Sequence, residues 1–72
     1  MRQSQRFMRR HDDNDGSPSA LRRFLETAPG VGNVLSLETH QKGGYRVIFD
    51  LTPDCIDAFI AALDKSGWMT VI

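Results

Sequence analysis

The stretch Tyr45-Arg46-Val47-Ile48-Phe49-Asp50-Leu51 decides the predicted fold, because its side chains alternate in character. Every second residue is apolar, and the residues between them are Arg46, Ile48 and Asp50. Successive side chains of a strand point to opposite faces of a sheet. The alternation therefore predicts a strand in a sheet that is covered on one face only.

The segment before this strand predicts the other half of a hairpin. Gln41-Lys42-Gly43-Gly44 supplies residues that favour a turn. The preceding stretch, 31–39, contains Val34, Leu35 and Leu37 and is typical of a strand. Two strands joined in this way form an antiparallel pair.

A helix is predicted on each side of the hairpin. Ser17-Pro18 opens the first, because serine caps free amides and proline at the first helical position gives up an unpartnered N–H. Its apolar stripe ends at Pro29-Gly30 and comprises Leu21, Phe24, Leu25 and Ala28. Thr52-Pro53-Asp54 opens the second helix, whose stripe is Ile56, Phe59, Ile60 and Leu63. Ser66-Gly67 ends it, and residues 68–72 predict a last strand.

The order from Ser17 is helix, strand, strand, helix, strand, which predicts an α+β fold of the ferredoxin-like βαββαβ type, with an antiparallel sheet and both helices on one face. The first strand is the weak element, because residues 3–9 offer only Phe7 and Met8 as apolar side chains. Three alternatives stay open: this poor strand is used, a partner chain fills its place, or the fold is a rearranged αββαβ variant. We therefore divide the chain into an N-terminal arm or weak strand, 1–16, and an α+β domain, 17–72.

Length, charge and cysteine content narrow the functional class. The chain has 72 residues, enough for one domain. Nine basic residues balance nine acidic ones, so the net charge does not indicate a class of partner such as nucleic acid. A lone cysteine, Cys55, excludes an internal disulfide framework. No apolar run is long enough for a membrane span or a secretory signal, so we expect a cytoplasmic protein without a membrane partner.

Leu25-Glu26-Thr27-Ala28-Pro29-Gly30-Val31, with the strand that follows it, resembles a core segment of heavy-metal-associated domains, the small copper and zinc chaperone modules. Residues 45–50 resemble the third strand of that family, and residues 60–68 resemble its closing motif of an isoleucine, a glycine and an aromatic residue. The resemblance implies the ferredoxin-like fold. That family binds soft metals through a Cys-x-x-Cys pair, but the corresponding loop here, residues 15–20, has no cysteine. No metal ligand is carried over.

Two polar clusters are candidate sites. His11, Asp13 and Asp15 could bind a hard or nickel-type cation, and the alternative is a solvated loop whose acids balance the arginines before it. The second cluster comprises Arg2, Arg6, Arg9 and Arg10; if this segment became helical, they would lie on one side of the helix and offer a nucleic-acid surface with Phe7. The acidic run beside these arginines opposes a polyanion, so nucleic acid is the less favoured partner.

No constellation of a nucleophile and an activated base is evident, so we predict no enzymatic activity and no cofactor. A sheet covered on one face leaves the other face to water, and we expect Val34, Ile48, Trp68 and Ile72 there. The leading hypothesis is a non-enzymatic protein-interaction module that binds a protein partner or a second copy of itself. The alternatives are a regulatory domain of the heavy-metal-associated or ACT type that binds a metal or small ligand, and weak nucleic-acid binding through the arginines.

Overall fold

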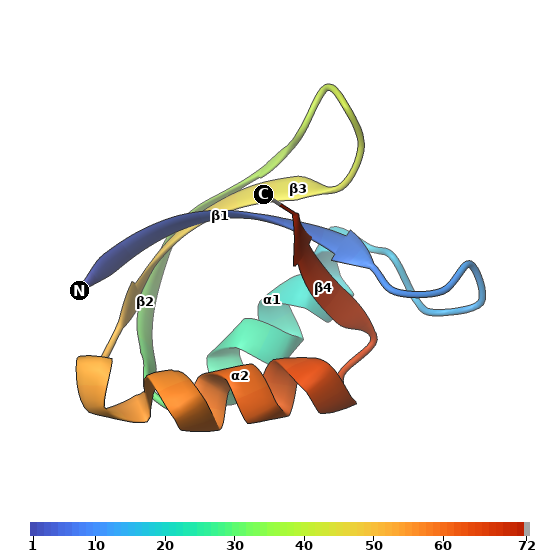
Figure 1. The fold of residues 1–72 in the computed structure, drawn as a ribbon. Coiled ribbons are helices and arrows are strands. Elements are labelled where there is room, and N and C mark those ends of the chain that lie inside the picture. The colour runs from blue at the N-terminus through green and yellow to red at the C-terminus, as the bar shows by residue number, and fades with distance from the viewer. Residues whose placement is uncertain (72) are drawn as a thin grey trace.

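The protein is described by a computed structural model that covers residues 1–71. Strands and helices follow one another as β1 (Arg2–Arg9), α1 (Pro18–Thr27), β2 (Val31–Thr39), β3 (Tyr45–Leu51), α2 (Ile56–Lys65) and β4 (Trp68–Val71), and a short 3-10 turn, Pro53–Cys55, precedes α2. The sheet has the order β2-β3-β1-β4, and all its neighbouring strands are antiparallel. Figure 1 shows both helices on the same side of this sheet. The predicted α+β class is confirmed.

Strand β1 lies inside the sheet despite its polar sequence. It pairs with β3 from Arg2, opposite Asp50, to Phe7, opposite Tyr45, and β4 flanks its other side. Only the helix-facing positions of such a strand need apolar side chains, and Phe7, which is 0% exposed, supplies the main one. The chain's own residues thus fill the first-strand position, and the alternatives of a mobile arm and of a partner's strand there are wrong.

The helices begin where the sequence predicts, by two different devices. In α1 the Ser17 Oγ accepts a hydrogen bond from the Ala20 N–H at 3.2 Å, as expected of a cap. Before α2 the Thr52 side chain makes no such bond, and the 3-10 turn provides the first turn instead. Each helix then buries two leucine or phenylalanine side chains against the sheet: Leu21 and Leu25 from α1, Phe59 and Leu63 from α2.

The core lies between the helices and the inner face of the sheet. Phe49 of β3 is at its centre, with its ring centroid 6.0 Å from that of Phe7 and 5.8 Å from that of Phe59. Aromatic pairs at this separation add to the stabilisation that burial itself gives. The outer face of the sheet, which no helix covers, is called the open face below.

One glycine, Gly44, allows the hairpin turn to approach β1 closely. Gly44 has a φ of 72°, a value that side chains other than glycine rarely adopt. A Cβ at this position would also collide with the Phe7 carbonyl oxygen. The close approach of the β2–β3 turn to β1 therefore requires glycine here.

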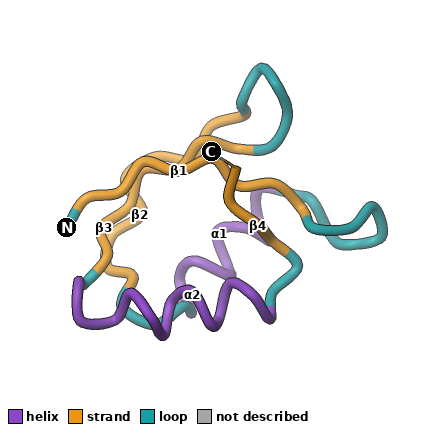
Figure 2. The backbone as a smooth tube through the Cα atoms, in the orientation of Figure 1, coloured by secondary structure: helices purple, strands orange, loops and turns teal. Residues whose placement is uncertain are grey.

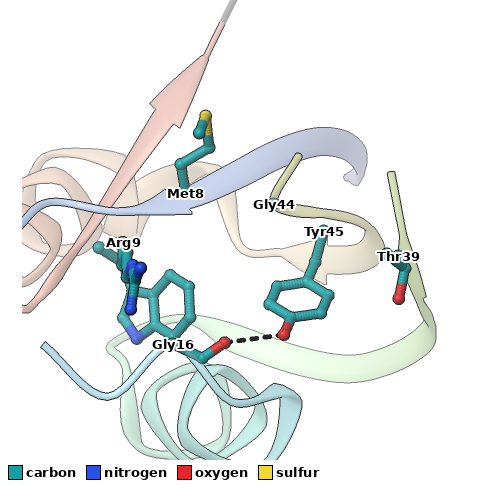
Figure 3. Close-up of a pocket in the computed structure, with 7 residues that line it drawn as sticks. Met8, Arg9, Gly16, Thr39, Gly44 and Tyr45 are labelled. Carbon is teal, nitrogen blue, oxygen red and sulfur yellow. Dashed lines mark hydrogen bonds between the residues drawn. The ribbon is translucent and has the colours of Figure 1, made fainter. Parts of the chain in front are cut away.

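Two loops leave the sheet where β1 ends: residues 10–17 and the β2–β3 turn (Figure 2). The Tyr45 hydroxyl donates a hydrogen bond of 2.7 Å to the Gly16 carbonyl (Figure 3), and the Arg10 N–H donates one of 2.8 Å to the Gly67 carbonyl. The first loop is therefore fastened at both of its ends. Within residues 1–71, neither helix is long and apolar enough to cross a membrane.

Candidate functional site on the open face of the sheet

The open face is defined by strand alternation and register. Because Phe7, Val47 and Phe49 are buried on the helix side, their sequence neighbours point outward. From β1, β3 and β4 the open face therefore presents Arg2, Ser4, Arg6, Met8, Arg46, Ile48, Asp50, Met69 and Val71. Basic and apolar side chains are thus mixed on one exposed surface with two carboxylates, those of Asp50 and of Glu38, which lies opposite Arg46 on β2.

A hollow of about 470 Å³ lies between this face and the β2–β3 turn. It is lined by Ser4, Gln5, Arg6, His40, Lys42, Arg46 and Val71, and we call it the basic hollow. Three of these side chains are cations, and none of the lining residues within the described chain is acidic. Like charges held together create a positive potential that attracts anions, and the nearest carboxylate on this face, that of Glu38 opposite Arg46 on β2, lies outside the lining.

Arg6 is the most firmly held of the three cations. Its Nε donates a hydrogen bond of 2.9 Å to the Gly43 carbonyl, and its Nη2 donates one of 2.8 Å to the Lys42 carbonyl. Both partners are neutral, so the guanidinium charge is oriented but not cancelled. Arg6 therefore fixes the turn over β1 and still contributes its charge to the hollow.

The other open-face arginines differ in their partners. Arg46 donates a longer hydrogen bond of 3.4 Å from Nη1 to the neutral Ser4 Oγ, and Glu38 lies opposite it on β2 without forming an ion pair with it in residues 1–71. Arg2 forms an ion pair with Asp50, with 3.4 Å between Nε and Oδ1. Surface pairs of this kind contribute little to stability, but they reduce the net charge locally. The positive potential is therefore concentrated at the end of the face where Arg6, Lys42 and Arg46 lie.

The positive potential of the hollow also affects the pKa of His40. Its Nδ1 accepts a hydrogen bond from the Lys42 N–H at 3.0 Å, which leaves the proton of the neutral ring on Nε2. Desolvation lowers the pKa of His40 below the ordinary value of 6.5, and repulsion from Arg6, Arg46 and Lys42 lowers it further. His40 is therefore a neutral donor within the hollow at pH 7.

The predicted interaction residues are only partly on this face. Ile48 is on it, half-buried. Trp68 is only 4% exposed and belongs to the core. It pairs with Arg9, which points to the helix side like Phe7, so Met69 and Val71 are the outward residues of β4. Val34 packs against the core opposite Phe49, because an irregularity between Val34 and Ser36 shifts the alternation of β2. The placement of Val34 and Trp68 on the open face is wrong, and Ile72 lies outside the described residues.

The four N-terminal arginines do not share one surface. They belong to a strand rather than to a helix, so only Arg2 and Arg6 point to the open face. Arg9 lines a pocket near Tyr45 and Trp68 on the other side (Figure 3), and Arg10 donates a hydrogen bond of 2.9 Å to the Trp68 carbonyl. The predicted nucleic-acid surface of these four residues is therefore not formed.

Two of the predicted cation ligands take part in hydrogen bonds of the 10–17 loop, His11 through its backbone N–H and Asp15 through its side chain. The His11 N–H donates to the Asn14 Oδ1 at 3.0 Å, and the Ser17 N–H donates to the Asp15 Oδ1 at 3.0 Å. Hydrogen bonding to Ser17, and to a lesser extent the positive charge of Arg23, lowers the pKa of Asp15 below its ordinary value of 3.8. Within residues 1–71, no three His, Cys, Asp or Glu side chains are placed to hold a metal ion. The geometry gives the metal hypothesis for His11, Asp13 and Asp15 no support.

His40, Lys42 and Arg46 are the residues that the sequence prediction missed. The alternation in residues 45–51 predicts that Arg46 faces away from the core, but it does not predict which residues of β1 lie beside Arg46. Alternation within residues 2–8, read as a strand, would have placed Arg2 and Arg6 beside it. Comparison with models of protein families, with curated proteins and with solved structures gave no match for this chain.

Proposed function

We propose that this chain is a non-enzymatic protein-interaction module of the ferredoxin-like type, and that its open face binds an acidic segment of a partner protein. The observation that carries this proposal is the basic hollow, where Arg6, Lys42 and Arg46 converge without an acidic lining residue in the described chain. The element order and the strand order β2-β3-β1-β4 support the ferredoxin-like assignment and the kinship to heavy-metal-associated domains.

A protein suits this surface because apolar side chains adjoin the charged ones. Ile48, Val71 and Met69 lie on the same face as Arg6 and Arg46, and Met69 is 38% exposed. A partner with acidic and apolar side chains would satisfy both kinds of contact, whereas a small inorganic anion would use only the cations.

Nucleic acid suits it less well. Recognition of single strands depends on aromatic side chains that stack on the bases. Every Phe, Tyr and Trp side chain of residues 1–71 belongs to the core or packs against it from the helix side, so the open face offers only the small His40 ring for stacking. An enzymatic role also finds little support, because no cysteine or carboxylate among the described lining residues accompanies His40.

Calorimetric titration with a blocked synthetic peptide of alternating glutamate and leucine tests the proposal. We expect saturable binding that weakens at least 10-fold in the double variant Lys42→Glu, Arg46→Glu, because two attractive charges become repulsive. The matched control is Arg22→Glu, Arg23→Glu, which makes the same change of net charge on exposed positions of α1 and should retain the affinity.

If both double variants weakened the binding of the peptide equally, the interaction would depend only on the net charge of the protein, and the proposal would be overturned. Tighter binding of a single-stranded oligonucleotide than of the peptide, lost in the same Lys42, Arg46 variant, would replace the protein partner with nucleic acid.

A further inference from the structure

Strand β1 has one edge that its neighbours only partly cover. β3 pairs with it along Arg2–Phe7, whereas β4 pairs with it only along Arg6–Arg9. Figure 1 shows β4 beside the second half of β1, with α2 running beneath the sheet. Within residues 1–71, the first half of β1 therefore has a strand neighbour on the β3 side alone.

The hydrogen-bonding groups on the uncovered side can be identified. Met1 and Leu51 exchange two backbone hydrogen bonds, with 2.7 Å from the Leu51 N–H to the Met1 carbonyl and 2.9 Å from the Met1 amino group to the Leu51 carbonyl. In an antiparallel pair such bonded positions alternate with unbonded ones, so Gln3 and Gln5 also bond to β3. The N–H and C=O groups of Arg2 and Ser4 then point to the uncovered side, where an added strand would pair with them.

A groove lies directly below this edge, between β1 and α2. It encloses about 320 Å³, and its lining includes Gln3 and Gln5 from β1, Thr70 from β4, and Ile56, Phe59 and Ile60 from α2. Ile60 is 48% exposed, although it lies on the apolar stripe of its helix. No charged side chain lines the groove, and most of its lining is apolar.

Edge and groove have the geometry of a site for an extended chain. A strand that continues the line of β4 along β1 would direct every second side chain into the groove. The side chains between them would lie on the open face next to Arg2, Ser4 and Arg6. Complementarity then requires apolar residues on the inward positions and acidic residues on the outward ones, chiefly toward Arg6, because Arg2 is already paired with Asp50.

We propose that Arg2 and Ser4 of β1, with the groove between β1 and α2, bind an extended acidic-apolar segment of a partner protein by strand addition. This second surface rests on the proposed function only in taking a polypeptide as its partner. Addition of a strand also predicts which peptide amides matter, because alternate amides of the incoming strand face β1 and the rest face solvent.

Amide hydrogen exchange, followed by NMR on the full chain, tests this. The probe is a blocked heptapeptide of alternating glutamate and valine. In the free protein we expect fast exchange at Arg2 and Ser4 and slow exchange at Gln3 and Gln5. Saturation with the peptide should slow Arg2 and Ser4 at least 10-fold. N-methylation of one alternate set of peptide amides should abolish this protection, and N-methylation of the other set should preserve it.

Ile60→Asp should weaken peptide binding at least 10-fold, and the matched control Ala61→Asp, at an exposed position of the same helix, should not. Shifts at groove residues with unchanged exchange at Arg2 and Ser4, or no binding of the heptapeptide, would overturn strand addition. If the glutamate and leucine peptide does not bind at the basic hollow, protection of the Arg2 and Ser4 amides that persists in the Lys42→Glu, Arg46→Glu variant would still support the edge site. Peptide shifts confined to the hollow would retain the proposed function and reject the edge site.

Discussion

The two faces of the sheet carry opposite kinds of side chain on the same strands. On β3, Phe49 is 1% exposed at the centre of the core, while its neighbour Ile48 faces outward beside Arg46. On β1, Phe7 is buried, while Arg6 crosses to the turn and lines the basic hollow. Adjacent residues thus differ in their surroundings: those on the helix side form the core, and those on the open side are the ones to which the proposed function assigns recognition.

The largest expected effect compares neighbours on β3. Phe49→Ala should lower the free energy of unfolding by about 3–5 kcal/mol, because it leaves a cavity among packed aromatic rings. A domain of this size has roughly 4–11 kcal/mol in total, so the variant should be largely unfolded or close to it. Ile48→Ser should cost only about 1 kcal/mol or less. Urea denaturation followed by Trp68 fluorescence gives both values, and equal losses would contradict the division between faces.

The next effect concerns the turn that joins the two faces. Gly44→Ala should cost about 2–3 kcal/mol, because left-handed backbone strain of about 1–2 kcal/mol is added to the collision with the Phe7 carbonyl. Gly43→Ala is the control: its φ is also positive, but a Cβ there would only touch side-chain atoms at 3.7 Å. Thermal unfolding of both variants should rank Gly44→Ala as the less stable, and the reverse order would argue against the close approach of this turn to β1.

A smaller effect separates two arginines of the open face. Arg6→Gln should cost about 1–2 kcal/mol, because the two carbonyls of the turn lose a charged donor. Arg46→Gln should cost less than about 0.5 kcal/mol, since its single hydrogen bond to Ser4 is long. Both should weaken binding of the acidic peptide. If Arg46→Gln were the more destabilising change in urea, the assignment of Arg6 as the residue that holds the turn would be mistaken.

The smallest effect is the titration of His40. Its lowered pKa means that the unfolded chain takes up the proton first as the pH falls. The associated stability is therefore present above pH 6.5 and is lost as the pH drops below that value. NMR titration should find the His40 pKa below 6.5 and should find it higher in Arg46→Gln, although still lowered by desolvation. An unchanged His40 pKa in that variant would mean that the charge of Arg46 has no effect on the potential at His40.

Local patterns in the sequence were sufficient to predict most of the fold. The alternation in residues 45–51 and the proline openings before each helix give bounds close to those of β3, α1 and α2. Strand β1 was harder to predict, because its pairing depends on backbone hydrogen bonds with β3 and β4 and needs one buried side chain, Phe7. Side-chain pattern carries little information about such contacts between distant parts of the chain.

The candidate site could not be predicted because it is assembled from such contacts. Arg6 and Arg46 are 40 residues apart and become neighbours only through the register of β1 and β3. Val34 was misplaced because a local irregularity of β2 breaks simple alternation, and Trp68 because the register of a short strand decides its face. Ile48 was placed correctly from alternation alone.

Mapping amide chemical shifts during titration with the glutamate and leucine peptide tests the central claim most directly. We predict that the affected amides belong to open-face residues around the basic hollow, including Arg6, Lys42 and Arg46, while those of Leu21 and Leu25 in α1 stay unchanged. Shifts centred on α1, or confined to the 10–17 loop, would contradict the assignment of recognition to the open face.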